Sequence, residues 1–509
     1  MEKRLVLAIA LSLLVMLSWS ALMPKSQLID NKVVMLNNGS KQLPLPASIA
    51  DNPAKILTPV ISETAAEVIK FQQDSREIVF DPAKAVIVEI NFKNNLEHRL
   101  PLKLGFFNGQ QDLFKLSSRT SDTISFVYED KNQRIIKSFF IPKDSYTIDL
   151  EITTQNLSSA PLLLNTPLIL GRLDLTSLNK QARFQDIYIS GKEKAAHYSA
   201  NKDLVLSEVK LIGLRDQYFC AIIEPVNAVT SGYVKKISPQ ESEVGLLVND
   251  LELKPGTQIG HLYHIYLGPQ DLKILNALKP EWTGIIYYGF FDFIAQLILQ
   301  LLGFFYSLVH NWGWAIILLS LAVYFMLFPL SIKQMRAMKE MQLLQPKIEA
   351  LRQELKDNPQ KLNKEIMELY KEHKVNPLGG CLPLLLQMPI FFALYQALIR
   401  SVALRGAHFL WIKDLSSPDK LFTLKTSLPL FGNQINILPI LMAIGMFIQQ
   451  KISTTKATGD AAQQQKIMAI IMPVMFGVIF YQMPSGLVLY WFVNSALMLA
   501  YQFKVNQQK

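Results

Sequence analysis

Charge and cysteine are both scarce in this chain of 509 residues. Charged residues make up 18% of it and hydrophobic residues 50%, whereas a soluble globular chain carries about 25% charged residues. This composition excludes an intrinsically disordered chain, a collagen and a coiled-coil rod. The two cysteines, Cys220 and Cys381, are too few for a disulfide framework and form no CxxC metal motif. We therefore expect a membrane protein with a soluble part attached.

The short motifs of common catalytic sites are also missing from the sequence. No HExxH, GxSxG or P-loop pattern occurs. His261 and His264 lie close together, but an odd separation in a strand places two side chains on opposite faces. We interpret them as unrelated histidines and expect no enzyme activity, no metal and no cofactor.

The positive charge is spread along the chain. The formal net charge is +10, which suits either nucleic acid or an anionic lipid surface. No stretch combines clustered Lys and Arg with interleaved aromatic residues, so we favour the cytoplasmic loops of a membrane protein. Recognition of a specific nucleic acid sequence is not expected.

A first apolar run stands near the start of the sequence. It follows the basic head Met1–Arg4, and its 19 residues, Leu5–Met23, carry no charge. That length comes close to crossing a bilayer core of about 30 Å. We favour a retained transmembrane anchor, and the alternative is a secretory signal cleaved near Ala21. In both interpretations the head stays inside and the next segment goes outside.

The second apolar run, Ile285–Leu330, is too long for one span. Its 46 residues include one formal charge and would reach about 69 Å as a helix. A break at His310–Gly313 leaves Asn311–Leu330 as a predicted span. Before the break, polar or small residues recur at helical spacing, which indicates an amphipathic helix lying in the membrane interface. These residues are Asp292, Gln296, Gln300, Gly303 and Ser307.

Three further runs complete the predicted membrane part. They are Leu378–Ile399, Leu428–Gln450 and Ile467–Phe503. The last has 37 residues, enough for two short spans around a turn at Met483–Gly486. The total is six spans with both termini inside. This topology keeps the loop Ile332–Asn376, with its ten Lys and Arg residues, on the cytoplasmic side.

The two regions outside the spans have different patterns. Runs such as Val86–Phe92 and Tyr146–Ile152 alternate apolar and polar residues, which predicts an antiparallel β-sandwich. The loop Ile332–Asn376 predicts a helical hairpin with its turn at Asp357–Pro359. Its mixed charges form either a solvated face or a surface that captures a partner.

The spans after the interfacial helix hold no acidic or basic residue in their cores. This weighs against an ion-coupled carrier, which usually needs acids within its spans. Amide groups such as those of Gln387, Gln449, Gln450 and Asn494 occur there instead. They either form interhelical hydrogen bonds, worth about 0.6 kcal/mol each, or line a wet cavity. Both interpretations stay open at this point.

Several long motifs stand out along the chain. They are Tyr266–Pro269, Leu344–Ile348, Asn376–Pro383, Gln387–Phe391, Gln464–Met468 and Pro484–Trp491. Together they resemble the YidC membrane protein insertases, the YidC/Oxa/Alb family. They occur in the family's order, and the resemblance extends over the whole chain, including the large outside domain of Gram-negative members.

The resemblance implies a polytopic α-helical membrane protein with a five-helix insertase core. It implies a hydrophilic groove open to the cytoplasm and the lipid, and insertion and folding of nascent inner-membrane proteins, alone or beside the Sec translocon. The implied partners are nascent membrane proteins, the translocon, the ribosome and membrane lipids. The implied location is the bacterial inner membrane, with the large domain in the periplasm and no ATP site.

The resemblance also points to groove and hairpin residues. The family usually carries an arginine in the groove, and aligning Asn311–Gly313 and Phe328–Leu330 puts that position at Tyr324. A mechanism based on a fixed groove cation therefore does not carry over to this chain. The other residues at or near groove positions are Gln387, Gln449, Gln450, Tyr490, Trp491 and Asn494, and the hairpin candidates are Lys333, Arg336, Pro346 and Lys347.

The predicted organisation divides the chain into seven parts. They are an anchor (1–24), a linker (25–59), the periplasmic β-sandwich (60–280), the interfacial helix (281–309), a span (310–331), the cytoplasmic hairpin (332–376) and the four-span core (377–509). The main alternative is a channel or carrier built on the same polar helical bundle. A second alternative is a membrane-anchored periplasmic binding module.

Overall fold

The computed structural model divides into two compact units, Met1–Tyr287 and Tyr288–Lys509. The anchor expected at 1–24 and the linker expected at 25–59 lie outside the described residues, as does most of the motif at 376–383. The structure describes residues 68–93, 98–109, 113–164, 167–176, 184–192, 194–248, 251–355, 358–373, 375, 382–428, 432–453 and 460–507.

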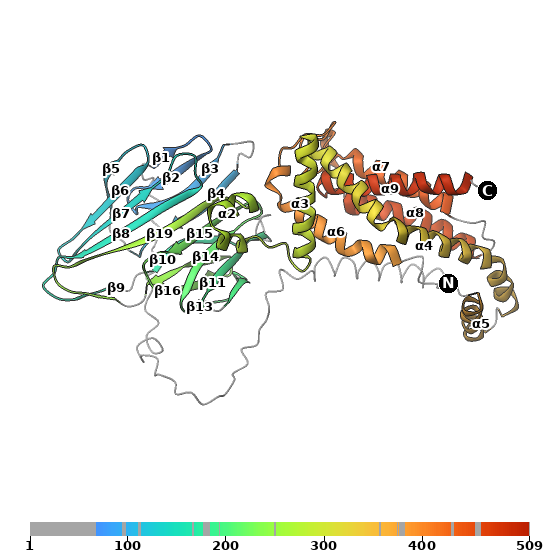
Figure 1. Cartoon of the computed structure of the whole chain (residues 1–509), viewed down its shortest axis with the longest axis horizontal. Helices are drawn as coiled ribbons and strands as arrows, with labels where there is room; N and C mark the ends of the chain where they lie inside the picture. The colour runs from blue at the N-terminus through green and yellow to red at the C-terminus, as the bar shows by residue number, and fades with distance from the viewer. Residues whose placement is uncertain are drawn as a thin grey trace, which may run out of the picture. The chain divides into compact units, whose positions relative to one another are not determined.

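The first unit, here called the β unit, is built from antiparallel sheets (Figure 1). One four-stranded sheet has the order β1 (Ile69–Gln72), β2 (Arg76–Asp81), β3 (Val86–Phe92), β4 (His98–Gly105). A second has the order β10 (Pro167–Asp174), β17 (Glu241–Val248), β16 (Thr230–Ser238), β13 (Leu204–Leu206). A small pair joins β9 (Leu162–Leu164) to β18 (Leu251–Leu253).

A nine-stranded sheet completes the β unit. Its order is β12 (Ala195–Tyr198), β11 (Asp186–Gly191), β14 (Val209–Arg215), β15 (Phe219–Pro225), β19 (Gln258–Pro269), β8 (Thr147–Asn156), β7 (Gln133–Phe140), β6 (Thr123–Glu129), β5 (Lys115–Arg119).

The two four-stranded sheets meet edge to edge and pack on the nine-stranded sheet. A bridge between Phe107 and Ile169 joins the chain just after β4 to β10. The ring of Phe80 on β2 lies 5.9 Å from that of Phe126 and 5.2 Å from that of Phe139, on β6 and β7. All three rings are fully buried, so the apolar faces of the two layers form the core.

The alternating pattern correctly predicted a β-rich domain. The run expected over Val86–Phe92 is strand β3, in which Val86, Ile90 and Phe92 are buried. The run expected from Tyr146 becomes β8, which begins at Thr147 and continues to Asn156. His261 and His264 both lie on β19, and His264 Nδ1 is 2.7 Å from Asp149 Oδ1.

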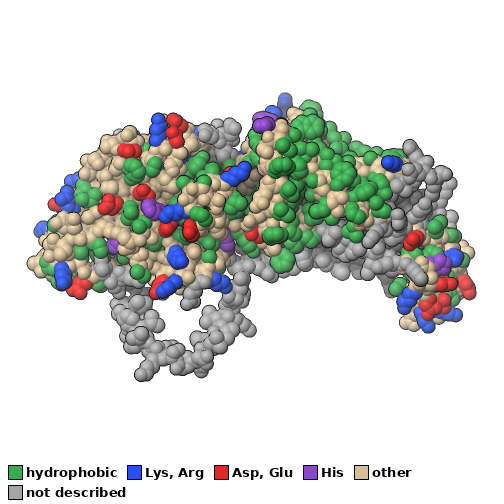
Figure 2. Space-filling model, viewed as in Figure 1, with side chains coloured by type: hydrophobic (Ala, Val, Ile, Leu, Met, Phe, Trp, Pro, Cys, Tyr) green, Lys and Arg blue, Asp and Glu red, His purple; other side chains and the backbone are tan. Residues whose placement is uncertain are grey.

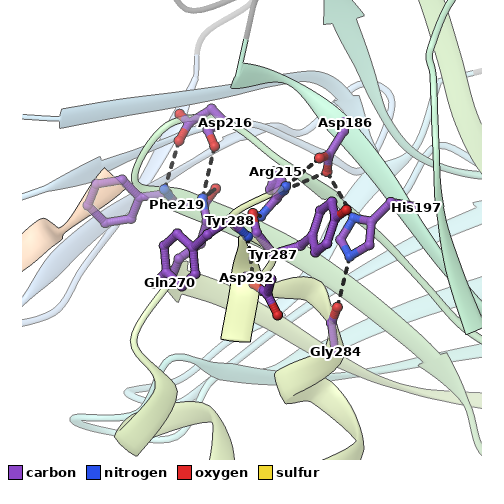
Figure 3. Close-up of polar contacts among 10 residues, drawn as sticks. All are labelled: Asp186, His197, Arg215, Asp216, Phe219, Gln270, Gly284, Tyr287, Tyr288 and Asp292. Atoms are coloured by element: carbon purple, nitrogen blue, oxygen red, sulfur yellow. Dashed lines mark hydrogen bonds and ion pairs between the residues drawn. The ribbon is translucent and has the colours of Figure 1, made fainter. Parts of the chain in front are cut away.

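A buried ionic cluster fixes the end of the β unit (Figure 3). After β19 the chain forms α2 (Leu272–Leu278) and a 3-10 helix, Pro280–Ile285. Arg215 donates two hydrogen bonds to the carboxylate of Asp186 and one, of 2.9 Å, to the carbonyl of Tyr287. The imidazole of His197 lies between Asp186 and Gly284, and its Nε2 is 3.0 Å from the carbonyl oxygen of Gly284. Residues of the three adjacent strands β12, β11 and β14 thus hold the segment that leaves the domain.

The second unit, here called the helical unit, contains seven described α-helices. Three are long and apolar enough to cross a membrane, over Asp292–Val309, Trp312–Ile332 and Ser485–Lys504, and shorter apolar helices cover Ile437–Ile452 and Ala469–Phe480. The full helices are α3 (Asp292–Val309), α4 (Trp312–Glu354), α5 (Pro359–Glu372), α6 (Leu382–Arg400), α7 (Ile437–Ser453), α8 (Asp460–Phe480) and α9 (Ser485–Gln507).

One predicted boundary in the helical unit is wrong. The span expected to start at Leu428 is preceded by a hairpin of β20 (Phe422–Leu428) and β21 (Gly432–Ile435), and α7 begins only at Ile437. Gly432 has φ +73°, a conformation that glycine adopts at little cost. The neighbouring residues Gly432 and Asn433 were a visible turn signal inside an apolar run.

The hairpin expected over 332–376 has a continuous first arm. Helix α4 runs through the predicted span and on to Glu354, and α5 returns along it. Leu344, Ile348 and Val375 form a small buried cluster between the arms, with Tyr370 packed against it. The hairpin therefore has its own apolar seam beneath its charged surface.

Candidate functional site

Polar side chains predicted to line a groove lie on α6 and α9. Gln387 Nε2 donates a 2.7 Å hydrogen bond to the hydroxyl of Tyr490, a fully buried residue. One turn later, Asn494 Nδ2 donates to the backbone carbonyl of Tyr490 at 3.0 Å. Helices α6 and α9 thus share a neutral polar cluster, and the sequence had placed all three residues in the groove.

Trp491 lies in an aromatic cluster beside this polar pair. Its ring is 5.4 Å from Phe391, 5.7 Å from Phe476 and 5.3 Å from Phe480. These partners lie on α6 and α8, so Trp491 joins three helices through ring packing. Stacked and edge-on aromatic pairs each stabilise a fold by about 0.5–1.5 kcal/mol beyond area burial. Packing is the contact that the structure records for this residue.

Tyr324 belongs to a different aromatic group. It lies on α4, half-buried, with its ring 5.8 Å from that of Phe328. Phe328 in turn lies 5.0 Å from the ring of Tyr501 on α9. The next two residues, Phe325 and Met326, are about two-thirds exposed, at 66% and 65%. Tyr324 therefore lies at the border between the packed interior and an exposed apolar surface.

The remaining predicted site residues lie on α7 and on the hairpin part of α4. Gln449 and Gln450 are half-buried in the last two turns of α7. Pro346 and Lys347 are exposed on α4, where Lys347 Nζ lies 3.0 Å from Nε2 of His373 at the end of α5. Lys333 and Arg336 belong to the same helix, but their side chains lie outside the described part of the structure.

A buried polar network that the sequence patterns did not predict lies at one end of the helical unit. Asp419, only 2% exposed, accepts hydrogen bonds from the backbone N–H groups of Ile437 and Leu438 at 2.8 and 3.0 Å. It therefore caps the first turn of α7. Asn436 donates to the carbonyl of Tyr481 at 2.6 Å and joins this cap to the end of α8.

The loop 401–421 joins further helix ends into the same network. The backbone N–H groups of Ser485 and Gly486, at the start of α9, donate to the backbone carbonyls of Ser417 and Leu415 at 2.8 and 2.9 Å. The side-chain amide of Asn311, the N-cap of α4, donates to the backbone carbonyl of His408 at 3.3 Å. No local sequence pattern indicates this network, because its partners are far apart in sequence. These bonds close one end of the helical unit.

An exposed apolar stripe runs along α3. Phe293, Leu297, Leu301, Phe304 and Leu308 follow each other at helical spacing and are between 37% and 81% exposed. The side chains that face neighbouring helices are Ala295, Ile298 and Leu302, which are buried. Figure 2 shows hydrophobic side chains covering this face of the helical unit, whereas the β unit has scattered charges. The stripe is an apolar face of α3 that the other described helices leave exposed.

A hollow between α7 and α8 is almost purely apolar. It has a volume of about 530 Å³. Its walls include Ile440, Ile444, Phe447, Pro473 and Val474. This hollow has little capacity to solvate a polar segment, so the polar groups of Gln387, Tyr490 and Asn494 remain the better candidate for that role.

Comparison with known proteins accounts for both units. Residues 77–301 match the family described as the YidC periplasmic domain, and residues 304–509 match the family described as 60Kd inner membrane protein. A membrane protein insertase YidC from Syntrophobacter fumaroxidans is 36% identical over 414 residues, which cover 79% of this chain and 74% of the relative.

One further relative extends the match along the chain, and a solved structure is reported beside it. The membrane protein insertase YidC of Ralstonia nicotianae is 30% identical over 497 residues, covering 92% of this chain and 86% of that protein. A crystal structure of an active YidC insertase, with its first transmembrane domain resolved, is 19% identical, has a TM-score of 0.42 and covers 86% of this chain and 93% of that chain. By its relatives' sequences, the chain belongs to the YidC family of membrane protein insertases.

Proposed function

We propose that the chain inserts and folds nascent inner-membrane proteins through a polar groove in its helical unit, alone or beside the Sec translocon. The observation that carries the proposal is the Gln387–Tyr490 hydrogen bond among apolar helices. Moving an unpaired polar group of a client from water into hydrocarbon costs several kcal/mol of free energy. Neutral donors and acceptors at depth reduce that cost and leave the apolar client segment free to enter the lipid.

The proposed groove comprises seven residues and works by hydration and hydrogen bonding. Because Tyr324 occupies the position of the family's usual arginine, the phenol supplies a neutral donor in place of a fixed cation. The half-buried position of Tyr324 beside exposed Phe325 supports access from lipid. The groove residues are Tyr324, Gln387, Gln449, Gln450, Tyr490, Trp491 and Asn494.

The proposed topology has six spans, with both termini in the cytoplasm and the β unit in the periplasm. The anchor 1–24 and five core helices, α4, α6, α7, α8 and α9, form the spans, and α3 lies in the interface. The basic residues of the hairpin support a cytoplasmic hairpin. The network around Asp419, at the other end of the helices, then closes the periplasmic end.

The hairpin is the proposed contact for partners in the cytoplasm. Its apolar seam holds the two arms together, so the exposed charges of both arms stand on a defined scaffold. We propose that this surface meets the ribosome, the translocon or the emerging client. Replacing 333–373 by a Gly/Ser linker of equal length is expected to impair insertion, and unchanged insertion removes the hairpin from the mechanism.

The decisive experiment is insertion of a small single-span client into liposomes that contain the purified chain. Wild type is compared with Tyr324→Phe and Tyr324→Arg, and Phe325→Leu serves as the neighbouring control. Loss of insertion in Tyr324→Phe alone would assign the phenol hydroxyl to the mechanism. Equal insertion by all variants would make position 324 a packing position. No insertion by wild type would contradict the proposal and favour the channel alternative.

A deletion separates the insertase from the periplasmic binding module. Removing 60–270 leaves every groove residue in place, so insertion of the same client is expected to persist. Loss of insertion by this deletion, with the helical unit still folded by circular dichroism, would place an essential function in the β unit.

A further inference from the structure

Two strands at sheet edges flank a hollow in the β unit. Strand β5 ends the nine-stranded sheet and β1 ends a four-stranded sheet, and each pairs on one side only within the described part of the chain. The hollow, here called the β1/β5 hollow, has a volume of about 600 Å³. Its lining residues include Val68, Lys70, Pro82, Leu113, Leu116 and Arg119.

Hydrogen bonds hold the walls of this hollow together. Arg119 Nη2 on β5 donates to the carbonyl of Lys70 on β1 at 2.9 Å. The N–H of Phe114 donates to the carbonyl of Ala83 at 2.8 Å, just before β5. Phe114 is buried and forms part of the lining. The hollow is therefore a built feature of the fold between two tethered edges.

Apolar side chains are exposed along this edge. Leu113 is 71% exposed, Val68 47% and Leu116 45%, and all five residues of β5 are exposed. An edge strand offers unpaired backbone groups to an added strand. A peptide that pairs with β5 would cover these side chains and satisfy those groups together.

The charges around the hollow select the kind of peptide. Lys70 and Arg119 line it, Lys115 stands on the same edge strand, and its lining contains no carboxylate. Lys70 Nζ lies 3.4 Å from Oε1 of Glu77. Two copies of such an edge would bring like charges together, which opposes pairing of the chain with itself. An acidic strand is attracted by the same charges.

We propose that the β1/β5 hollow binds an extended, acidic peptide segment that adds to β5 as a further strand. Its apolar side chains cover Leu113, Leu116 and Val68, and its carboxylates meet Lys70 and Arg119. Translocated client segments would supply such peptides, and this source of peptides depends on the proposed insertase function.

The test measures peptide binding to the full-length chain in detergent micelles by fluorescence anisotropy. The probe is a labelled nine-residue peptide that alternates glutamate and valine. We expect saturable binding at micromolar concentration, with affinity at least tenfold lower for a lysine–valine peptide of the same pattern. Methylating every amide nitrogen of the glutamate peptide is expected to cause a similar loss. Equal binding by all three peptides would overturn the proposal.

Matched variants locate the site. Lys70→Glu combined with Arg119→Glu is expected to weaken binding of the glutamate peptide at least tenfold. Lys210→Glu combined with Lys254→Glu changes two exposed lysines of the same unit and should leave the affinity unchanged. An equal loss of peptide affinity in both double variants would show that only the net charge of the unit matters, which would contradict the proposal.

Two further outcomes are distinguished in the same preparations. If the chain binds the peptide only after deletion of 50–67, a segment of the chain itself occupies the hollow and the proposal is wrong. Insertion of the single-span client is measured in parallel. Failed insertion with intact peptide binding counts against the proposed function and leaves this inference standing.

Discussion

The β unit buries charged groups, whereas α6 and α9 of the helical unit meet through neutral polar side chains among the described residues. Arg76 is fully buried and donates to the carbonyls of Leu267 and Ser145, each at 2.7 Å. Burial lowers the pKa of its guanidinium from 12.5 to about 10. In the helical unit, the interior polar bond between Gln387 and Tyr490 joins two uncharged groups.

The difference follows from where backbone carbonyls are available. Loops and sheet ends in the β unit leave carbonyls that can accept from a buried cation. A helix in hydrocarbon uses nearly all of its carbonyls in its own hydrogen bonds. A cation at Tyr324 would therefore depend on water or on a client for its partners. A neutral phenol does not impose that requirement.

Removing one partner of the buried Arg215–Asp186 ion pair should cause the largest loss of folding stability. Burial alone would raise the pKa of Asp186, but the charges and hydrogen bonds of Arg215 and His197 together outweigh it and hold that pKa well below its usual range. In Arg215→Ala the carboxylate stays buried without its cation, so the β unit should lose about 3–5 kcal/mol. Hydrogen–deuterium exchange of β11 and β14 in the full chain measures this loss.

The control for this prediction is Arg99→Ala. Arg99 is exposed and pairs with Glu89 at the surface, so we expect a loss of no more than about 1 kcal/mol. Equal losses in the two variants would show that burial does not distinguish the ion pairs of the β unit.

Lys137 should make the stability of the β unit depend on pH. Its ammonium donates to the carbonyls of Ala85 and Phe106 at 2.7 and 2.6 Å, and burial lowers its pKa from 10.5 to about 7. Between those values the unfolded chain binds the extra proton, so this residue makes stability rise with pH. The slope is about 1.4 kcal/mol per pH unit.

Substitution tests this contribution directly. Lys137→Met should flatten the stability change between pH 7 and pH 9 by about 2–3 kcal/mol relative to wild type. Hydrogen–deuterium exchange of β6 and β7 at both pH values gives the comparison. Lys210→Met, at an exposed lysine of β14, should keep the wild-type slope. An unchanged slope in Lys137→Met would contradict the lowered pKa.

Removing the Asp419 cap at the closed end of the helical unit should cost less stability than breaking the buried ion pair of the β unit. Asp419→Ala removes the acceptor for two N–H groups of α7 and for Trp411 Nε1, which lies 3.2 Å away. Loss of a helix cap costs about 1–2 kcal/mol. Asp419→Asn keeps an acceptor oxygen and should retain most of the stability. Unfolding by dodecyl sulfate titration in mixed micelles measures both, and equal stability of Ala and Asn would exclude capping.

The interior polar pair should contribute least to stability. A double-mutant cycle of Gln387→Leu and Tyr490→Phe is expected to give a coupling of about 0.6 kcal/mol, the average for interhelical hydrogen bonds in membranes. The same titration measures it. A larger loss of insertion than of stability would indicate that the pair serves clients, whereas parallel losses would assign it to packing alone.

The sequence revealed local periodicity better than long-range polar contacts. Strand β3 and the turn before α9 follow from patterns within a few residues. The late start of α7 was missed because the apolar run from Leu428 hid a hairpin around Gly432. Asn436 and Tyr481 are 45 residues apart, and nothing in the spacing of either residue announces their contact.

By itself, the sequence determined the β-rich domain, the apolar helices and the family, because hydrophobic periodicity and contiguous motifs are local properties of a chain. It also led to the prediction, still untested, that Tyr324 occupies the position of the family's usual arginine. Only the tertiary structure decided which polar groups meet. It paired Gln387 with Tyr490, packed Trp491 among phenylalanines and set Asp419 at the start of α7. These choices depend on three-dimensional distance, since a buried polar group is satisfied by whichever partner the fold brings within hydrogen-bonding reach.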